Sequence, residues 1–419
     1  MTEVLTPDQA AAGILECCLR HEPPPSDAVG YLLNEASSED EERARVATKA
    51  LFTGLVEPLC DRFDRELVEA YVELFSWACA PVVGVRRSDL VCRYERVRRP
   101  KPFAGAPPER VFVLSRITVG ADVAVTSVLM DAAHKRFPGS QVVFVGPAKN
   151  YELFEGAGWV RHAPFSYGRR SALPERLAVF NPLRHMMGTE DAIVIDPDSR
   201  LTQLGLLPVC PEDRYYFFES RAYGGAGTEP LSTLASRWAA EIFDVEDAQA
   251  FVAPKPVPAP GERPLITVSL GVGENPARRV NDPFEGRLLS AMGELGGVVV
   301  VDKGPGGEEA ERVERALAGV VDKPQVQAHE GSFASFASLI CQSSLYVGYD
   351  SSGQHVAAAA AIPEVTVCAG HLSDRMSQRW RPSGKGSSAV FRVEPPVTVD
   401  ALVEDVMTAA RGLLRGKQT

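Results

Sequence analysis

The sequence predicts an α/β protein that contains two doubly wound parallel sheets and an all-helical N-terminal block. Three observations support this fold class. Apolar residues recur at helical spacing over residues 1–100, with few β-branched runs. From residue 110 onward, continuous apolar strands alternate with helical segments, which is typical of parallel sheets covered on both faces. A proline-rich stretch at 244–264 divides this part into two halves, so we expect two sheets.

The N-terminal block contains at least three amphipathic segments. They are TPDQAAAGILECCLR (6–20), EDEERARVATKALFTGLVEPL (39–59) and RELVEAYVELFSWACA (65–80). Thr6 is a candidate N-cap for the first of them. The basic, proline-rich stretch 93–110 resembles a linker, so we expect residues 1–100 to pack as a separate domain.

Each half of the remaining chain begins with a strand that a helix follows. In the first half, VFVLSRI (111–117), a helical segment and QVVFVG (141–146) predict a β-α-β unit. The other expected strands are AIVID (192–196), RYYFFES (214–220), LITVSLG (265–271), VVVVDKG (298–304), LYVGYD (345–350), EVTVCA (364–369) and AVFRV (389–393). We predict sheet domains over 101–253 and 254–395 and a C-terminal helix over 396–419. The ligand site is expected in the cleft between the sheets.

Composition and charge narrow the class of function. The chain carries 44 Lys and Arg against 55 Asp and Glu, a net charge of −11, which argues against a general nucleic-acid binder. No apolar run is long enough to span a bilayer, and the first residues do not have the pattern of a signal peptide. The eight cysteines include no CxxC pair, so no metal site is expected and a reduced, cytoplasmic setting fits best.

Two loops of the first half carry carboxylates at strand ends. In SRITVGADVAVTS (115–127), Gly120 allows a tight turn and Asp122 begins a helix, where a carboxylate could act as a general base or simply cap the helix. In IDPDSRLTQLG (195–205), Asp196, Asp198 and Arg200 cluster, and an internal Asp–Arg pair is the simpler interpretation.

A loop of the second half combines glycines and arginines. In SLGVGENPARRVNDPF (269–284), Gly271 and Gly273 follow a strand, and Arg278 and Arg279 come next. Glycines let backbone N–H groups approach a phosphate, and arginine binds phosphate oxygens through its planar fork. The spacing matches neither a Walker A loop nor GxGxxG.

A polar cluster stands at the mouth of an alanine-rich helix in LYVGYDSSGQHVAAAAAIP (345–363). Its members are Asp350, Ser351, Ser352, Gly353 and His355. A helix N-terminus offers unpaired N–H groups and a positive dipole end, which suits an anion, although one of these residues could simply be an N-cap. Together with the arginine loop, this mouth predicts a diphosphate site.

The order of these segments resembles the heptosyltransferase-like glycosyltransferases of family 9, which have the two-domain GT-B fold. The resemblance covers roughly residues 110–419 and rests on VGADVAVTSVLMDAAHKRFPGSQVVFVG, ITVSLGVGENPARR, FASFASLICQSSLYVGYDSSGQHVAAAAAIP and RWRPSG (379–384). Residues 1–100 have no counterpart in that family.

The resemblance implies a role for each candidate. Asp122 matches the family's presumed catalytic base, although this chain reads Gly-Ala-Asp where Gly-Asp is usual. Arg278 or Arg279 falls at the basic diphosphate residue, and Glu308 is a candidate for the ribose-binding glutamate. Ser351, Ser352 and Gly353 would hold the diphosphate with Asp350 fixing the loop, and His355 would support or protonate a phosphate oxygen.

The expected function is therefore an inverting, metal-independent transfer of a sugar, for example a heptose, from a nucleoside-diphosphate sugar. The acceptor class stays open among glycolipid, glycan, protein and small molecule. No separate cofactor is implied, and the helical block is expected to dock an acceptor or another subunit. Two alternatives remain, an epimerase or hydrolase of the same fold and a non-catalytic nucleotide-sugar-binding protein. The resemblance also leaves open a peripheral position at the inner membrane.

Overall fold

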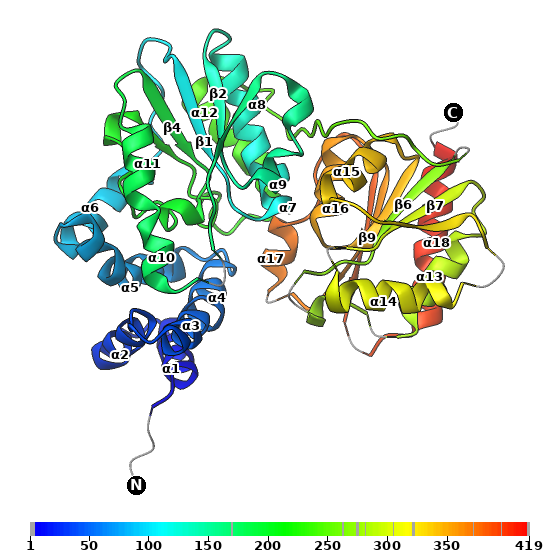
Figure 1. The fold of residues 1–419 in the computed structure, drawn as a ribbon, viewed down its shortest axis with the longest axis horizontal. Helices are drawn as coiled ribbons and strands as arrows, with labels where there is room; N and C mark the ends of the chain where they lie inside the picture. The colour runs from blue at the N-terminus through cyan, green and yellow to red at the C-terminus, as the bar shows by residue number, and fades with distance from the viewer. Residues whose placement is uncertain are drawn as a thin grey trace.

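The computed structural model describes residues 5–168, 171–261, 264–273, 276–280, 282–304, 306–320, 323–371, 373–394 and 396–416. Within these ranges two separate parallel sheets lie side by side, each flanked by helices (Figure 1). The predicted fold class is confirmed.

The first sheet has the strand order β3-β2-β1-β4-β5. Its strands are β1 (Arg110–Leu114), β2 (Gln141–Gly146), β3 (Val160–Pro164), β4 (Ala192–Asp196) and β5 (Tyr215–Phe217). Its helical segments are α7 (Val119–Ala121), η2 (Asp122–Thr126), α8 (Ser127–Arg136), α9 (Ala148–Tyr151), η3 (Glu155–Ala157), α10 (Leu173–Ala178), α11 (Phe180–Met187), η4 (Arg200–Thr202), η5 (Glu212–Arg214) and α12 (Leu231–Phe243).

The second sheet has the strand order β11-β10-β9-β6-β7-β8. Its strands are β6 (Leu265–Ser269), β7 (Val298–Asp302), β8 (Val326–His329), β9 (Leu345–Tyr349), β10 (Glu364–Ala369) and β11 (Ser388–Val393). Its helical segments are η6 (Pro276–Arg278), α13 (Phe284–Met292), α14 (Gly307–Ala318), α15 (Phe333–Gln342), α16 (Ser352–Ala359), α17 (Asp374–Arg379) and α18 (Val399–Gly416).

Burial explains which strands the sequence revealed. β6, β9 and β10 are buried at every position, so they read as continuous apolar runs. β3 and β8 were not predicted. They are short edge strands with partly exposed positions and the mixed sequences VRHAP and VQAH, which lack the apolar run of a central strand.

The proline-rich stretch crosses from one sheet domain to the other, as expected. The Ala253 amide donates to the Leu153 carbonyl at 2.7 Å on the first side. The Val257 amide donates to the Ser338 hydroxyl at 2.9 Å on the second side. The crossing is thus attached to both halves and is not a free tether.

The N-terminal block consists of α1 (Pro7–Leu19), α2 (Ser26–Ala36), α3 (Glu41–Lys49), η1 (Ala50–Val56), α4 (Glu57–Cys60), α5 (Arg65–Val83) and α6 (Arg87–Val97). The Thr6 cap is confirmed, since its hydroxyl accepts from the Gln9 amide in a capping box. Among the described residues no single helix is long and apolar enough to cross a membrane, although α5 and α6, bent by 112°, pass that test as a pair.

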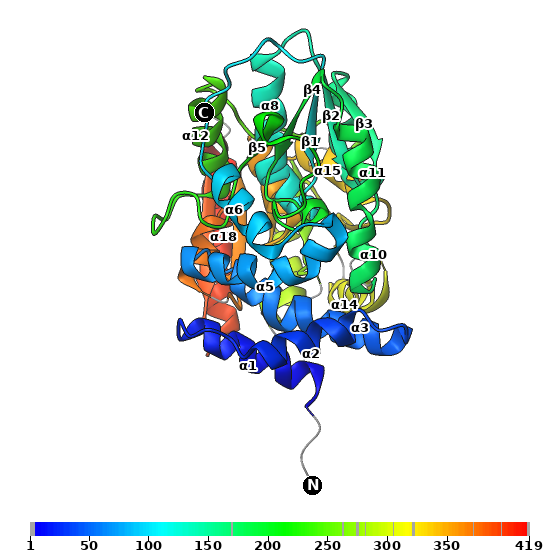
Figure 2. The ribbon, with the colours of Figure 1, turned by 90° about the vertical axis from the view of Figure 1, so that its left-hand side faces the viewer.

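The helical block does not pack as a separate unit, which corrects that expectation, whereas the domain boundaries themselves stay predictions. Buried residues such as Leu51 and Phe75 share one apolar core with Phe112, Leu114 and Val194 of the first sheet. Figure 2 shows these helices stacked beneath the sheet. Burying the underside of the sheet in this way is a large part of the hydrophobic stabilisation of both parts.

Polar contacts reinforce this shared core. The Tyr71 hydroxyl donates to the Gln203 carbonyl at 3.0 Å, and the Arg93 guanidinium donates to the Gly205 carbonyl at 2.8 Å. Glu219 accepts from the Tyr94 hydroxyl and pairs with Arg98 at 3.1 Å. These partners lie more than 100 residues apart, so the block is fixed in orientation as well as in place.

The stretch 93–110 is not a free linker, which is a second correction. Residues 93–97 complete α6, and Arg93, Tyr94 and Val97 are buried. Farther along, the Phe103 ring packs 4.9 Å from the Phe137 ring, and its amide donates to the Ile242 carbonyl. The prolines of this stretch indicate only that it is irregular.

We predict that a chain lacking residues 1–102 does not fold cooperatively, because the apolar underside of the first sheet would be exposed to water. Soluble yield and the thermal unfolding transition measure this effect. A chain lacking only residues 1–4 is the control and should unfold like the full chain. A cooperative transition in the long truncation would show that the helices are dispensable for folding.

Candidate functional site

The mouth of α16 lies at the carboxyl edge of the second sheet. Asp350 and Ser351 connect β9 to this helix, and among the described residues no side chain caps its N-terminus. The simple N-cap interpretation of this cluster is therefore not observed. Gly353 is required here because a Cβ would collide with the Tyr346 hydroxyl. Because no described side chain caps the helix, its first N–H groups have no intrahelical or capping partner within the part of the chain that the structure describes.

The same mouth touches the carboxyl edge of the first sheet. A Cβ on Gly120 would come within 3.1 Å of the His355 ring and 3.2 Å of the Ser352 Cα atom. In Figure 1, α7 and α16 meet where the two halves of the molecule approach each other. The structure thus brings together two loops, more than 230 residues apart, that the sequence singled out independently. Glycine at position 120 permits this approach.

Asp122 lies just behind this contact and is fully buried. Its carboxylate accepts hydrogen bonds from the Arg116 amide (2.6 Å), the Ser115 hydroxyl (2.6 Å), the Thr126 hydroxyl (2.7 Å) and the Asn150 amide (2.6 Å). Burial raises the pKa of Asp122, and the hydrogen bonds oppose that change. This geometry holds the β1–α8 loop together. Whether Asp122 is also the catalytic base stays a prediction.

The two arginines of the donor loop have different surroundings. Arg279 pairs with Asp282 and Glu285, each at 3.2 Å. Arg278 instead lies near Cys368 and His371, beside the mouth of α16, where its positive charge tends to lower the pKa of both side chains. Its Nη2 atom lies 4.0 Å from the Met376 Sδ atom. Arg278 is therefore better placed than Arg279 to meet an anion at that mouth.

The glycines and the glutamate candidates of the donor loop also separate. A Cβ on Gly271 would lie 2.7 Å from the Glu309 carboxylate. Gly273 has a φ of +66°, and a Cβ there would meet no described atom within 4 Å. Glu308 is exposed at the first turn of α14, and its neighbour Glu309 is half-buried against the loop. Burial raises the pKa of Glu309, which Arg312 opposes. Whether Glu308 or its neighbour binds a ribose stays a prediction.

His355 is buried with its ring 5.9 Å from the Trp380 ring. Burial lowers its pKa to about 4, against the opposing effect of Asp350. The imidazole is therefore neutral at pH 7 and can donate a hydrogen bond to a phosphate oxygen. Whether the ring also protonates a bound phosphate oxygen stays a prediction.

Two residues of the site were missed from the sequence. Cys368 in β10 and His371 just beyond it approach Asp350, with His371 Nε2 3.2 Å from Asp350 Oδ2. Burial raises the pKa of Cys368 to about 12. The sequence contained one indication of this proximity. β9 and β10 are successive strands, and if they pair in parallel their carboxyl ends lie next to each other.

The acidic cluster after β4 is internal, as expected, but its partner differs. Asp198 pairs with Arg221 at 2.6 Å, whereas Arg200 pairs with Glu57 of the helical block at 3.0 Å. Burial raises the pKa of Asp196 to about 6, opposed by hydrogen bonds that include one from Tyr215. Of these contacts, the Arg200–Glu57 pair attaches the helical block to the first sheet.

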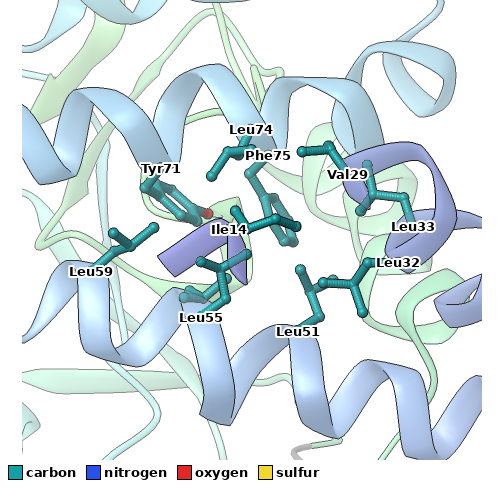
Figure 3. A pocket seen from close by; sticks show the side chains of 11 residues that line it. Ile14, Val29, Leu32, Leu33, Leu51, Leu55, Leu59, Tyr71, Leu74 and Phe75 are labelled. Atoms are coloured by element: carbon teal, nitrogen blue, oxygen red, sulfur yellow. The ribbon is translucent and has the colours of Figure 1, made fainter. Parts of the chain in front are cut away.

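The N-terminal block contains a small apolar cavity of about 10 Å³. Side chains from α1, α2, η1, α4 and α5 point into it, among them Ile14, Leu32, Leu55 and Phe75 (Figure 3). The Tyr71 hydroxyl at its edge already donates to the Gln203 carbonyl. The described lining offers no group for chemistry, so the pocket belongs to the packing of the block.

Comparison with solved structures identifies the architecture. The chain is similar to a family 9 glycosyltransferase from Veillonella parvula, with a TM-score of 0.57 and 17% identity over 74% of this chain and 97% of that chain. It is similar to E. coli heptosyltransferase WaaC with ADP, with a TM-score of 0.55 and 16% identity over 72% of this chain and 99% of that chain. It is also similar to E. coli ADP-heptose lps heptosyltransferase II, with a TM-score of 0.50 and 20% identity over 74% of this chain and 100% of that chain.

The fold is GT-B. No protein-family model matches the chain. No curated protein matches it either. The solved GT-B structures are matched over nearly their whole length, whereas about a quarter of this chain has no equivalent in them. The GT-B chain therefore carries an addition to a complete two-sheet core.

We predict that His355 makes the protein less stable in acid. A histidine whose pKa falls from 6.5 to about 4 on folding stabilises the fold fully above pH 6.5, and this contribution is lost as pH falls toward 4. Between pH 7 and 5 the free energy of unfolding should fall by about 2 kcal/mol more in the parent than in His355→Asn. Urea unfolding at both pH values measures this difference.

The exposed His185 provides the control for this measurement. His185→Asn should show the parent's full pH dependence. An equal acid sensitivity in the parent and His355→Asn would contradict the assignment of the effect to His355.

Proposed function

We propose that this GT-B protein is a glycosyltransferase that moves a sugar from a nucleoside-diphosphate sugar to an acceptor hydroxyl. The observation that carries the proposal is the contact between the uncapped mouth of α16 and the Gly120 loop of the other sheet. An anion site on one sheet and a carboxylate loop on the other are what transfer between two bound substrates needs.

On the donor side, the N–H groups of Ser351, Ser352 and Gly353 would bind the diphosphate. Arg278 would add a fixed positive charge, since Arg279 is held by Asp282 and Glu285. We assign ribose binding to Glu309 in preference to Glu308, because Glu309 faces the donor loop at Gly271. Since WaaC binds ADP in its solved structure, adenine nucleotides are the first donors to test.

The proposed reaction is a single displacement, which inverts the configuration at the anomeric carbon. Asp122 would take the proton of the acceptor hydroxyl as that oxygen attacks, and the nucleoside diphosphate would leave with its bonding electrons. The arginine and the helix mouth would stabilise the charge that develops on the leaving oxygen. In this scheme side chains, and no metal ion, neutralise the phosphates.

Burial sets a condition on the proposed base. The Asp122 carboxylate has no exposed surface and already accepts four hydrogen bonds. It can reach an acceptor only if the β1–α8 loop shifts, for instance when the two halves part to admit substrates. Because burial is what raises its pKa, Asp122 would be a stronger base than an exposed aspartate only while the loop keeps it shielded from water.

The acceptor would bind between the first sheet and the helical block. The block reaches the second half as well, where the Arg375 guanidinium donates to the Phe63 carbonyl at 2.8 Å. The proposal keeps glycolipid, glycan, protein and small-molecule acceptors open, along with a second copy bound through the block.

A nucleotide-sugar screen tests the function. At 100 times its dissociation constant a bound donor stabilises the protein by about 2.7 kcal/mol, which a thermal-shift measurement detects. Product analysis then separates transfer from epimerisation or hydrolysis, and binding without turnover would indicate a non-catalytic protein. Failure of every nucleoside diphosphate and nucleotide sugar to bind would overturn the proposal.

We predict that Arg278→Ala weakens nucleoside-diphosphate binding by roughly 1.5–3 kcal/mol, the typical cost of losing a charged hydrogen bond. Isothermal titration measures the dissociation constant. Arg279→Ala is the matched control and should leave binding nearly unchanged while lowering stability, because Arg279 pairs with Glu285. The reverse pattern would exchange the two roles.

We also predict that Asp122→Asn lowers turnover by about a hundredfold or more with donor affinity nearly unchanged. Thr126→Val removes a hydrogen bond to the same carboxylate but leaves the base in place, so it separates the two roles of Asp122. If both variants lose activity and stability in equal proportion, Asp122 only holds the loop. Transfer rate and unfolding free energy are measured side by side.

A further inference from the structure

Three side chains with metal-binding atoms converge where β9 and β10 end. Asp350 follows β9, Cys368 lies in β10, and His371 follows that strand. The Asp350 amide donates to the Val367 carbonyl at 3.1 Å, which fixes the two strand ends together. The carboxylate oxygen, thiol sulfur and ring nitrogen that could coordinate an ion all lie within 4.8 Å of one another.

All three side chains are shielded from water. As whole residues, Asp350 is 7% exposed and Cys368 is 6% exposed. The side chains of Asp350 and His371 are 8% and 7% exposed. The approach is tight as well, because a Cβ on Gly370 would collide with the Ala277 carbonyl oxygen. The backbone that carries His371 is thus pressed against the donor loop, which limits where its ring can lie.

The His371 ring provides an independent observation. Neither of its nitrogens has a hydrogen-bond partner among the described residues, although Nε2 lies 3.2 Å from Asp350 Oδ2. A buried polar group without a partner is costly. The His371 Nε2 and Asp350 Oδ2 atoms are thus close together without forming a hydrogen bond. Such an arrangement is what two ligands of one metal ion would have. Tetrahedral bonds of about 2.0–2.1 Å place two ligand atoms roughly 3.3 Å apart.

We propose that Asp350, Cys368 and His371 bind a divalent transition-metal ion of the zinc type. Thiolate, imidazole and carboxylate are the ligands that zinc takes in tetrahedral sites, whereas a thiolate disfavours magnesium and calcium. Three protein ligands leave a fourth position for water. Nothing in this assignment depends on the proposed glycosyl transfer.

The charges in the cluster balance when the ion binds. The Cys368 thiol loses its proton to solvent on coordination, so a thiolate and a carboxylate together offset the two charges of the ion. The site is then neutral, and the nearby Arg278 guanidinium is not repelled by it. Arg392 also tends to lower the pKa of His371, and its guanidinium already pairs with the Asp374 carboxylate at 2.5 Å.

The ion would connect two strand ends directly ahead of α16. Asp350 also accepts a hydrogen bond from Gln354 in the first turn of that helix. Bound metal would therefore fix the backbone from Asp350 to Ser352 and shape the mouth of the helix. Its role is to order the loop, and it need not contact the transferred sugar.

Zinc and cobalt binding by the full-length protein test the site. The protein is stripped with a chelator and titrated with Zn²⁺ and with Co²⁺, with metal content measured by mass spectrometry after gel filtration. We expect one equivalent of tightly held metal and a thiolate-to-cobalt charge-transfer band. Absence of stoichiometric binding by the parent would overturn the proposal.

Variants assign the ligands. Cys368→Ser and His371→Ala should each weaken binding by at least tenfold, and Cys368→Ser should abolish the charge-transfer band. Cys341→Ser is the control, because Cys341 lies in α15 outside the cluster, and it should bind like the parent. Unchanged binding in both ligand variants would place the metal elsewhere and refute this site.

A fold defect in one variant does not obscure the result. Circular dichroism identifies such a variant, and His371→Gln then serves as a milder substitution that keeps polarity but removes the imidazole. Nucleotide binding is measured separately on the metal-loaded parent. Its failure would count against the proposed function alone, whereas a failed metal titration would count against the ion alone.

Discussion

Parallel pairing is the constraint from which the arrangement of this protein follows. In each sheet every strand runs in the same direction, so all carboxyl ends lie along one edge. The Asp122 loop, the mouth of α16, Cys368 near the end of β10 and His371 beyond that strand all lie at such edges. Bringing the two edges together, with glycine at position 120, concentrates the polar groups of two domains in one place.

The helical block adds a second constraint, because it is joined to both halves. It shares an apolar core with the first sheet and meets the second through Phe63, whose carbonyl accepts from Arg375 and whose ring lies 6.3 Å from Trp380. If the two halves part, the contacts of Phe63 with Arg375 and Trp380 must either break or be kept because the helical block moves with the second half. The block is thus in a position to influence how readily the proposed site opens.

The sequence predicted those features that burial imposes on residue patterns. Continuous apolar runs revealed the central strands, and Thr6 as a candidate N-cap revealed the start of α1. Short edge strands such as β3 and β8 lack that pattern, because water satisfies their exposed side. Packing of the helical block could not be foreseen either, since an amphipathic helix does not encode which surface it covers.

Prediction of the site had a similar limit. Residue types and spacing singled out the Gly120 loop and the mouth of α16, which the structure brings together. They could not distinguish Arg278 from Arg279 or Glu308 from Glu309, because such choices depend on which neighbour each side chain meets. Cys368 and His371 had no motif of their own. Their proximity to Asp350 comes from strand pairing, which acts across the sheet and leaves no trace in local spacing.

The burial of the mouth residues connects these features to the proposed chemistry. His355 is neutral, Asp122 is enclosed, and His371 has no hydrogen-bond partner among the described residues. Each of these groups sits in a low-dielectric environment, where a nearby charge is felt more strongly than in water. An anion that enters such a site would interact strongly with the few cations left there, and Arg278 is among them. Exclusion of water would thus strengthen donor binding, at the cost of requiring the two halves to move before an acceptor can reach Asp122.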